Sequence, residues 1–271
     1  MGVEGRAMSF GQAEKKGEVK RMYERTVKTV DDLQNDINEY RPLSHNALKQ
    51  LKEYYRIGLT YSSNALEGNS LTETETKIVL EEGITIGGKP LKDHFEALGH
   101  SEAYDHLHKL SKNRIITEQD ILELHKLFYY RIDKEDAGVY RKAPVIITGV
   151  DFKFPPPSKI KPLMQEFVKG IPSLKEKYHP VEYSALIHLR LVNLHPFIDG
   201  NGRTARLLMN LALLQAGYVI AIIPPVLRRE YLDSLKVSNR GDNKPFISLI
   251  VAMVYESQKD YLRILQTLSE K

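Results

Sequence analysis

Apolar residues recur every three or four positions along most of this chain, which is the period of an amphipathic helix. Strict alternation of apolar and polar residues, the pattern of a half-buried strand, is much rarer. The pattern predicts helices over residues 19–40, 93–110, 117–130, 158–170, 181–194, 203–216, 227–237 and 245–268, and two more that begin near Ser44 and Thr72.

Several helix ends carry their own local signals. Pro42 follows the first predicted helix as a stop, and Ser44 is a suitable N-cap for the second. Thr72 and Glu75 have the spacing of a capping box, and Gly83 has the conformational freedom that a helix terminator needs. These signals separate the N-terminal helices into distinct elements joined by short loops.

One region is typical of β-structure. The segment PVIITGVDFKFPPP, residues 144–157, places two short β-rich runs around Gly149 and Asp151 and ends in a proline block. We therefore expect a mostly α-helical bundle with one small β-hairpin. The chain contains no internal repeat, and no linker is long enough to divide its core.

Composition and charge exclude several classes of protein. The 271 residues are 42% hydrophobic and 27% charged, which is ordinary for a soluble globular chain, and a net charge of +4 is too small to indicate a nucleic-acid partner. The absence of cysteine excludes disulfides, thiolate nucleophiles and sulfur-ligated zinc. A chain without cysteine is what we expect of a protein in the reducing cytoplasm.

The two segments that could interact with a membrane do not have the required pattern. Residues 1–20 mix both charge signs without an apolar block, so we expect a disordered tail rather than a secretory signal. Residues 207–227 carry no charge, but Asn210, Gln215 and Gly217 interrupt them, and two prolines follow. A buried helix followed by a turn is the better interpretation, with no membrane span.

Chemically useful residues are concentrated in LHPFIDGNGRTARL, residues 194–207. If one helix ends near Leu194, where Pro196 resists continuation, and the next begins near Gly202, the loop between them lies at a helix N-terminus. Unpaired N–H groups and the helix dipole favour an anion there. Gly200, Asn201 and Gly202 suit such a turn, because glycine and asparagine tolerate left-handed conformations.

The side chains around this loop indicate which anion it binds. Arg203 and Arg206 are three residues apart, so both are expected to point toward the same anion. Asp199 would repel a phosphate unless a divalent cation lay between them, and carboxylate with phosphate oxygens is a usual magnesium environment. His195 is the natural proton acceptor. The stretch therefore predicts a polyphosphate nucleotide, magnesium and a general base.

The same residues carry a family resemblance. HPFIDGNGRTAR, residues 195–206, matches the Fic family motif HxFx(D/E)GNGRxxR at every specified position. The resemblance implies a helical Fic core over residues 93–256, followed by a C-terminal helix end over 257–271. It also implies transfer of AMP from ATP to a Ser, Thr or Tyr hydroxyl of a target protein.

The resemblance assigns a role to each motif residue. His195 would deprotonate the target hydroxyl, Asp199 would hold Mg²⁺ or Mn²⁺, and Phe197 would anchor the loop in the core. The nucleotide-binding residues implied are Gly200, Asn201, Gly202, Arg203 and Arg206. Tyr231 and Asn239 lie where a wall facing the adenine would be expected, although no motif identifies either residue.

The predicted hairpin also has a counterpart in the family. It occupies the place of the flap, which registers an extended target segment by main-chain pairing. The flap residues implied are Val145, Ile146, Ile147, Thr148, Gly149, Val150, Asp151, Phe152, Lys153 and Phe154.

A second motif lies upstream, in the N-terminal helical region over residues 21–92. In SSNALEGNS, residues 62–70, Ser63, Glu67 and Gly68 match the family's inhibitory motif (S/T)xxxE(G/N), here on a helix over about residues 58–68. A glutamate on this helix would pair with Arg206 and prevent ATP from taking a productive pose. The motif therefore predicts a self-inhibited enzyme.

The resemblance leaves alternatives open. In some relatives the equivalent glutamate orients a water that removes AMP from a modified target, so a deAMPylase that uses Glu67 is one alternative, and a nucleotide-sensing interaction module is another. The partners implied are ATP and a target protein, with the chain itself as one candidate target and a homodimer as one candidate assembly. No nucleic acid and no membrane are expected as partners.

Overall fold

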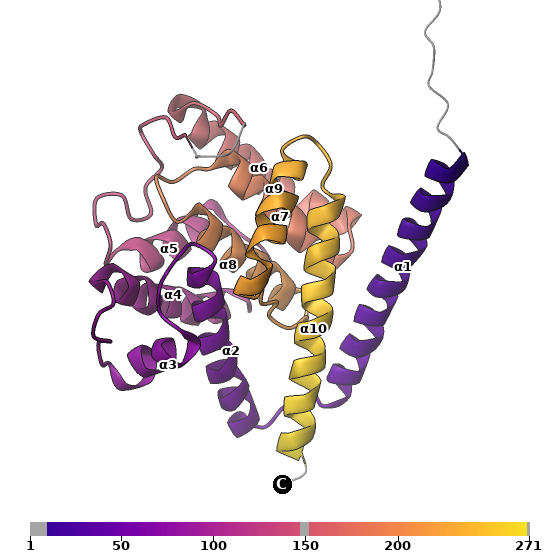
Figure 1. Ribbon diagram of the computed structural model, residues 1–271, viewed down its shortest axis with the longest axis horizontal. Helices are drawn as coiled ribbons and strands as arrows, with labels where there is room; N and C mark the ends of the chain where they lie inside the picture. Colours follow the sequence, from indigo (N-terminus) through magenta and orange to yellow (C-terminus); the bar gives the residue numbers. More distant parts are fainter. Residues whose placement is uncertain (1–9, 147–151, 270–271) are drawn as a thin grey trace, which may run out of the picture.

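The computed structural model describes residues 10–146 and 152–269, with side chains for residues 24–146 and 152–268 (Figure 1). All regular structure in this part of the chain is helical. The helices are α1 (Phe10–Glu39), α2 (His45–Ala65), α3 (Glu73–Glu82), α4 (Leu91–Leu110), α5 (Glu118–Tyr129), α6 (Pro157–Lys177), α7 (Pro180–Leu194), α8 (Asn201–Gln215), the 3₁₀ turn η1 (Pro225–Leu227), α9 (Arg228–Ser238) and α10 (Lys244–Ser269).

Helix α8 lies in the middle of the molecule, between α4 and α5 on one side and α7 and α9 on the other (Figure 1). Every residue from Arg203 to Leu213 is buried, because α2, α4, α5 and α7 all pack against this helix. Burial on all sides explains why residues 207–213 are uncharged. Among the described helices, none combines the length and apolar character that crossing a membrane requires.

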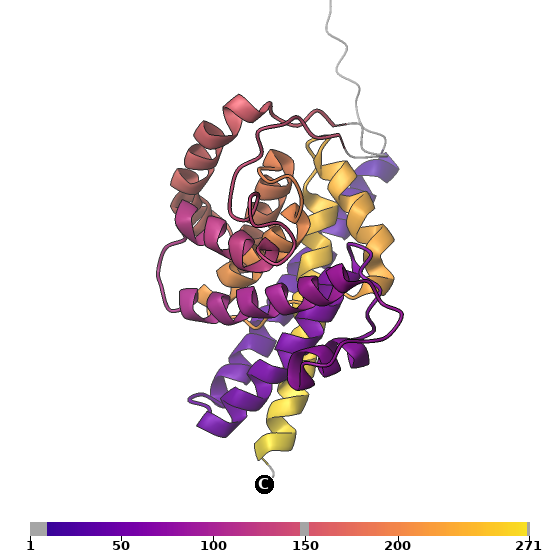
Figure 2. The same cartoon turned by 90° about the vertical axis from the view of Figure 1, so that its left-hand side faces the viewer.

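The N- and C-terminal helices run alongside one another. Helix α10 packs against both α1 and α2, and the three lie together at the lower end of the molecule in both views (Figures 1 and 2). Helix α2 is anchored on α10 by Tyr55, which is 4% exposed and donates a hydrogen bond to the carbonyl of Ser257. This packing fixes the direction in which α2 runs toward α8.

Helices α4 and α5 approach each other closely, and this contact positions Phe128 beside the start of α8. A Cβ atom on Gly99 would lie 2.3 Å from the carbonyl oxygen of Phe128, so only glycine permits this contact. The ring of Phe128 then reaches the start of α8, where a Cβ atom on Gly200 would lie 2.7 Å from it. Gly200 has a φ of 74°, which also favours glycine.

The helix ends that have local signals lie where the sequence predicts them. The Ser44 hydroxyl accepts a hydrogen bond from the N–H of Ala47, and Thr72 and Glu75 form the complete capping box. Gly83 ends α3 in the left-handed conformation. Each of these ends depends on residues no more than three positions apart.

Two predicted boundaries were wrong, and a third prediction is untested. Helix α1 begins at Phe10, so residues 10–20, which we expected to be disordered, are helical; they are rich in Glu, Lys and Gln, which favour helices. Helix α6 continues past Gly170 to Lys177, because Ile171 and Leu174 extend its buried face. The described residues flanking the predicted flap contain no strand, and Ile147, Thr148, Gly149, Val150 and Asp151 lie outside the described residues, so the hairpin remains a prediction.

Candidate active site

The motif-bearing stretch forms the connection between α7 and α8. Helix α7 ends at Leu194, and His195 turns the chain with φ 48° and ψ 57°. Among the described residues it is the one non-glycine residue with a positive φ. Its N–H still donates to the carbonyl of Leu191 at 2.9 Å. Non-glycine residues in this conformation are uncommon and often lie at functional sites, where surrounding contacts hold them.

Asn201 fixes the shape of the loop from inside. Its Oδ1 accepts a hydrogen bond from the N–H of Phe197 at 3.0 Å, and its Nδ2 donates to the carbonyl of the same residue at 2.9 Å. The side chain is buried, and both of its polar atoms are bonded to the loop. Only the backbone N–H of Asn201 is therefore suited to the anion-binding role expected of it.

His125, on α5, supports the loop from outside. Its Nδ1 accepts a hydrogen bond from the N–H of Gly138 at 2.9 Å, so Nε2 carries the proton and donates to the carbonyl of Asp199 at 3.1 Å. The ring stacks on Phe197 with centroids 3.7 Å apart. Burial lowers the pKa of His125 to about 4, so the ring is neutral at neutral pH and keeps this tautomer.

The N-terminus of α8 is an anion-binding site that a carboxylate already approaches. Gly200 caps the helix without a side-chain hydrogen bond, so the first N–H groups have no side-chain cap. Glu67, from the turn that follows α2, lies directly against this helix end. Its Oε1 is 2.3 Å from the position that a Cβ atom on Gly202 would occupy. The carboxylate thus lies where the loop is suited to hold a phosphate.

Arg206 holds Glu67 in this position. Its Nη2 donates to Oε1 of Glu67 and to the carbonyl of Ser63, both at 2.7 Å. The Nε atom donates to the Ser63 hydroxyl at 2.9 Å, and Nη1 donates to the Tyr231 hydroxyl at 3.0 Å. Arg206 is 2% exposed. The guanidinium therefore joins the end of α2 to α8 and α9.

The charge of Glu67 depends on its two arginine neighbours. Burial alone would raise the pKa of Glu67, but Arg206 and Arg203 together outweigh burial and hold the pKa below its usual value. Glu67 is therefore ionised at neutral pH, although its side chain remains 37% exposed.

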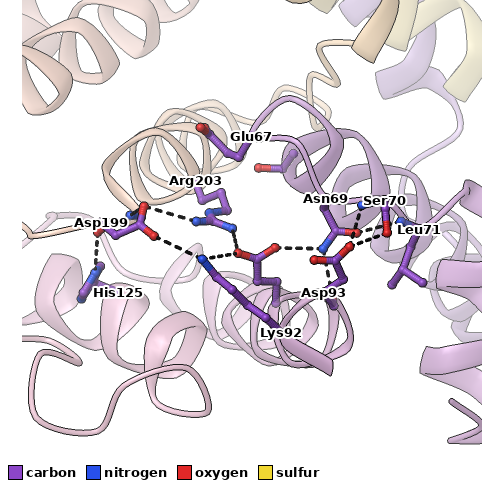
Figure 3. Close-up of polar contacts among 12 residues, drawn as sticks. Glu67, Asn69, Ser70, Leu71, Lys92, Asp93, His125, Asp199 and Arg203 are labelled. Carbon is purple, nitrogen blue, oxygen red and sulfur yellow. Dashed lines mark hydrogen bonds and ion pairs between the residues drawn. The ribbon is translucent and has the colours of Figure 1, made fainter. Parts of the chain in front are cut away.

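Arg203 has a different set of contacts from Arg206. Its Nη1 lies 2.7 Å from Oε1 of Glu96, on α4 (Figure 3). Its guanidinium lies over the ring of Phe128, 4.3 Å from the ring centroid. We expected both arginines to point toward one anion. Arg206 pairs with Glu67 and Arg203 pairs with Glu96, because α4 packs beside α8 and places Glu96, 5% exposed, against Arg203. Both arginines still lower the pKa of Glu67, so their joint binding of one anion stays a prediction.

The turn that carries Glu67 is fastened to α4. Gly68 reverses the chain with a φ of 97°, and the next two residues bond to acids on α4. Asn69 Nδ2 donates to Oε2 of Glu96 at 2.9 Å, and Ser70 donates to Asp93 from its N–H and its hydroxyl (Figure 3). Glu96 therefore contacts both the turn and Arg203 of the motif.

Asp199 is suited to a magnesium ion. Its side chain is 45% exposed, its Oδ1 accepts a hydrogen bond from the N–H of Gly200 at 2.6 Å, and its Oδ2 lies 3.9 Å from Nζ of Lys92. The described residues contain no group of three His, Asp or Glu side chains that could cage a metal. Magnesium is usually coordinated by one or two carboxylates together with substrate phosphates and water, and the single exposed carboxylate of Asp199 is compatible with such a site.

His195 has a neutral imidazole beside this site. Burial, reinforced by the Arg141 cation, lowers the pKa of His195 to about 4, although the nearby carboxylates and the carbonyl of Val192 oppose the shift. The ring lies 4.6 Å from the ring of Phe154, at the end of the predicted flap. A neutral imidazole at the edge of an anion site can accept a proton.

Tyr231 and Asn239 differ in their remaining hydrogen-bonding capacity. The Tyr231 hydroxyl is engaged by Arg206 and by Nε2 of His188, and the residue is 2% exposed. In contrast, Oδ1 of Asn239 is buried and accepts no hydrogen bond from the described part of the chain. Asn239 therefore retains an acceptor for a ligand.

The structure brings the two sequence motifs together, across a separation of 139 residues between Glu67 and Arg206. Four supporting residues were missed from the sequence: Lys92, Glu96, His125 and Arg141. A signal existed for Glu96, because Asp93, Glu96 and His100 follow helical spacing on the same face as buried Tyr104 and Leu107. Acids on the apolar face of a helix indicate a buried partner.

Comparisons with known proteins agree with this geometry. Residues 115–213 match the sequence profile of the Fic/DOC family. The protein adenylyltransferase Fic of Drosophila melanogaster is 36% identical over 247 residues, which cover 90% of this chain and 49% of the relative. The protein of the same name from Drosophila willistoni is 38% identical over 222 residues, or 81% of this chain and 44% of the relative. The chain thus spans about half the length of these relatives.

Solved structures extend the similarity to the fold. A fragment of Fic-1 from C. elegans superposes with a TM-score of 0.84 and 32% identity, over 94% of this chain and 76% of the fragment. A Fic domain containing signaling protein from Bacteroides thetaiotaomicron superposes with a TM-score of 0.81 and 27% identity, over 88% of this chain and 97% of its own. The expected helical fold is confirmed.

Proposed function

The chain belongs to the Fic/DOC family, and from that membership we propose that it is an autoinhibited adenylyltransferase that moves AMP from ATP to a hydroxyl group of a target protein. One observation carries the proposal. The N-terminus of α8 is an anion site lined by motif residues, and the chain's own Glu67 carboxylate lies against it, held by Arg206 at 2.7 Å. An enzyme that needs this site for phosphate would be inhibited by that contact.

The proposed reaction uses His195 as the base. Its neutral imidazole accepts the proton of the target Ser, Thr or Tyr hydroxyl. The hydroxyl oxygen then forms a bond to the α-phosphorus of ATP, the bond from that phosphorus to the bridging oxygen breaks, and pyrophosphate leaves. The left-handed turn at His195 ends α7 and begins the loop that leads to the N-terminus of α8.

The remaining motif residues bind and orient the nucleotide. Backbone N–H groups at the start of α8 donate hydrogen bonds to the phosphate oxygens, and Arg206 neutralises the outer phosphates once Glu67 has left it. Asp199 would hold Mg²⁺, which would supply positive charge to the phosphates. The free acceptor of Asn239 is suited to an amino group of the base.

Glu67 acts as the brake in this proposal. Glu67 is ionised and pairs with Arg206. It lies at the N-terminus of α8, which has no side-chain cap. A charge-assisted hydrogen bond contributes on the order of 1.5 to 3 kcal/mol, which corresponds to roughly 10- to 150-fold in an equilibrium. Removal of Glu67 should therefore raise transfer by one to two orders of magnitude.

A second function, removal of AMP from a modified target, is favoured by the exposure of Glu67. Its side chain is 37% exposed, and it lies beside the loop that would bind the phosphate. An ionised carboxylate that solvent can reach can take a proton from a water molecule. That water would attack the phosphorus of the AMP–protein bond and release the hydroxyl and AMP.

The test uses ATP labelled at the α-phosphate, Mg²⁺ and a soluble protein extract. Wild type, Glu67→Gly and the Glu67→Gly/His195→Ala double variant are compared for label on protein, and isothermal titration calorimetry measures their binding of ATP with Mg²⁺. Label with Glu67→Gly that disappears in the double variant would support both the transferase and its brake.

Two other outcomes separate the alternatives. Proteins labelled by Glu67→Gly are re-isolated and incubated with wild type; release of AMP that Glu67→Gly alone does not produce would support the hydrolytic function. Tight ATP binding with no label in any variant would overturn the transferase and indicate a nucleotide-sensing module.

A further inference from the structure

Arg141 has a set of contacts that the proposed reaction does not use. It is 3% exposed, and its side chain donates three hydrogen bonds to three different backbone carbonyls. Nε donates to His195 at 2.7 Å, Nη1 to Ala143 at 2.9 Å and Nη2 to Pro155 at 2.6 Å. Its own N–H donates to the carbonyl of Pro196 at 2.9 Å.

The arrangement is specific to arginine. No carboxylate of the described residues pairs with Arg141, and burial lowers its pKa below the usual value. A buried cation without a counter-charge is unfavourable unless its donors are well satisfied. The planar guanidinium can reach three carbonyls that lie in different directions, whereas the single ammonium group of lysine cannot match this fork. The contacts therefore indicate that Arg141 joins three backbone segments.

Those segments are the catalytic loop and the two ends of the predicted flap. Ala143 and Pro155 bracket residues 145–154, so one guanidinium holds both ends of that segment together and ties them to the backbone of His195. Phe154, directly before Pro155, places its ring 4.6 Å from the His195 ring. The positions of Ala143 and Pro155 relative to His195 are thus set through Arg141.

We propose that Arg141 is a positioning residue that holds the target-docking segment in register with His195, so that the acceptor hydroxyl of the target is aligned with the base. The inference rests on the proposed transferase function. It requires that loss of Arg141 impairs use of the acceptor protein far more than binding of the nucleotide, because the hydrogen bonds of Arg141 go to carbonyls that precede α8 and not to the N-terminus of that helix.

The experiment is carried out on the full chain in the Glu67→Gly background. Arg141→Gln removes the cation, and Arg141→Lys keeps a buried cation but loses the bridge. Arg131→Gln is the matched control, because Arg131 makes a bidentate ion pair with Glu102 at the surface, with both distances 2.6 Å. Each variant is measured for thermal unfolding, for binding of ATP with Mg²⁺, and for labelling of an extract over a range of extract concentrations.

We expect the Arg141 substitutions to affect the two substrates, ATP and the acceptor protein, to different extents. Arg141→Gln and Arg141→Lys should bind ATP within about twofold of the parent while protein labelling falls on the order of 100-fold, as expected when reacting groups are misaligned. The ratio of AMP released to water over AMP transferred to protein should rise. Arg131→Gln should match the parent in every measurement.

Three outcomes would overturn the inference. Normal labelling by both Arg141 variants, a parallel loss of ATP binding and labelling, or failure of both variants to fold would each assign Arg141 a role other than positioning. Absence of label from the Glu67→Gly parent itself is a different result, because it contradicts the proposed transferase function and not the role of Arg141.

Discussion

The Oε1 atom of Glu67 lies 2.3 Å from the position that a Cβ atom on Gly202 would take. Real Cβ atoms do not approach oxygen so closely, so the glutamate and any side chain on Gly202 exclude one another. Gly202 is helical and has an ordinary φ, so backbone freedom does not explain the glycine. It leaves a space at the helix end that a carboxylate or a phosphate can fill, but not both together.

Gly202→Ala should therefore displace Glu67 without activating the enzyme. The added methyl group takes the space of the Glu67 carboxylate, but the phosphates need the same space. In the Glu67→Gly background, Gly202→Ala should weaken binding of ATP with Mg²⁺ by about tenfold, or about 1.4 kcal/mol. Calorimetry of the single and double variants measures this. Activation of the wild-type chain by Gly202→Ala alone would contradict the shared space.

The acidic limb of the pH–rate profile should lie well below the ordinary histidine value. Burial lowers the pKa of His195 to about 4, whereas a free histidine has a pKa of about 6.5. The base form is lost as the pH falls through the folded pKa, so transfer by Glu67→Gly should stay nearly constant from pH 8 down to about 5.5. Initial rates of labelling test this. An acidic limb centred near pH 6.5 would mean that His195 is solvated during the reaction.

Glu96 should matter for stability more than an exposed acid of the same type. It is 5% exposed and pairs with Arg203, which is 3% exposed. Removal of one partner leaves a buried charge, so Glu96→Ala should lower the free energy of unfolding by about 3 to 5 kcal/mol. Glu102→Ala, which breaks the surface pair with Arg131, should lower it by no more than about 1 kcal/mol. Urea denaturation of both variants makes the comparison.

The elements predicted correctly from the sequence depend on short-range chemistry. The capping box of Thr72 and Glu75 spans three residues, so the start of α3 could be found without knowledge of the fold. The end of α7 at Leu194 was equally accessible, since Pro196 resists continuation of a helix. The sequence predicts the end of α6 at Gly170, but Ile171 and Leu174 continue the buried face of this helix, against which α5 and α7 pack.

The motifs identify candidate site residues at two points of the chain, and the structure brings Glu67 and Arg206 together, while the roles of the motif residues stay predictions. His195, Asp199 and Arg206 could be assigned because they follow one another closely, and Glu67 because it belongs to a second motif. His125 and Asp199 are 74 residues apart, and Arg141 and His195 are 54 apart, so spacing along the chain gave no sign of either contact. The pairing of Arg203 with Glu96 on α4 could not be predicted either, because it is set by helix packing; the role of Arg203 in binding phosphate stays a prediction.

Acid should destabilise the fold before the carboxylates titrate, because several histidines are buried in neutral form. Burial lowers the pKa of His100 to about 3 and that of His125 to about 4, whereas the same residues in the unfolded chain have a pKa of about 6.5. Between these values the unfolded state binds protons that the native state does not. The contribution of these neutral histidines to the free energy of unfolding is therefore fully present above about pH 6.5 and declines as the pH falls.

The size of this decline can be tested one histidine at a time. Each buried histidine should remove up to about 1.4 kcal/mol of unfolding free energy per pH unit below its unfolded pKa. His100→Gln should lower the overall stability at pH 7, because His100 bonds to Thr60 in the core, and should also flatten the slope between pH 6.5 and 5. His45→Gln, at an exposed position, serves as the control for a His→Gln substitution outside the core. Urea titrations at several pH values measure both. Equal slopes for His100→Gln and wild type would mean that His100 takes up its proton in the folded state, which would place water in the core between α2 and α4.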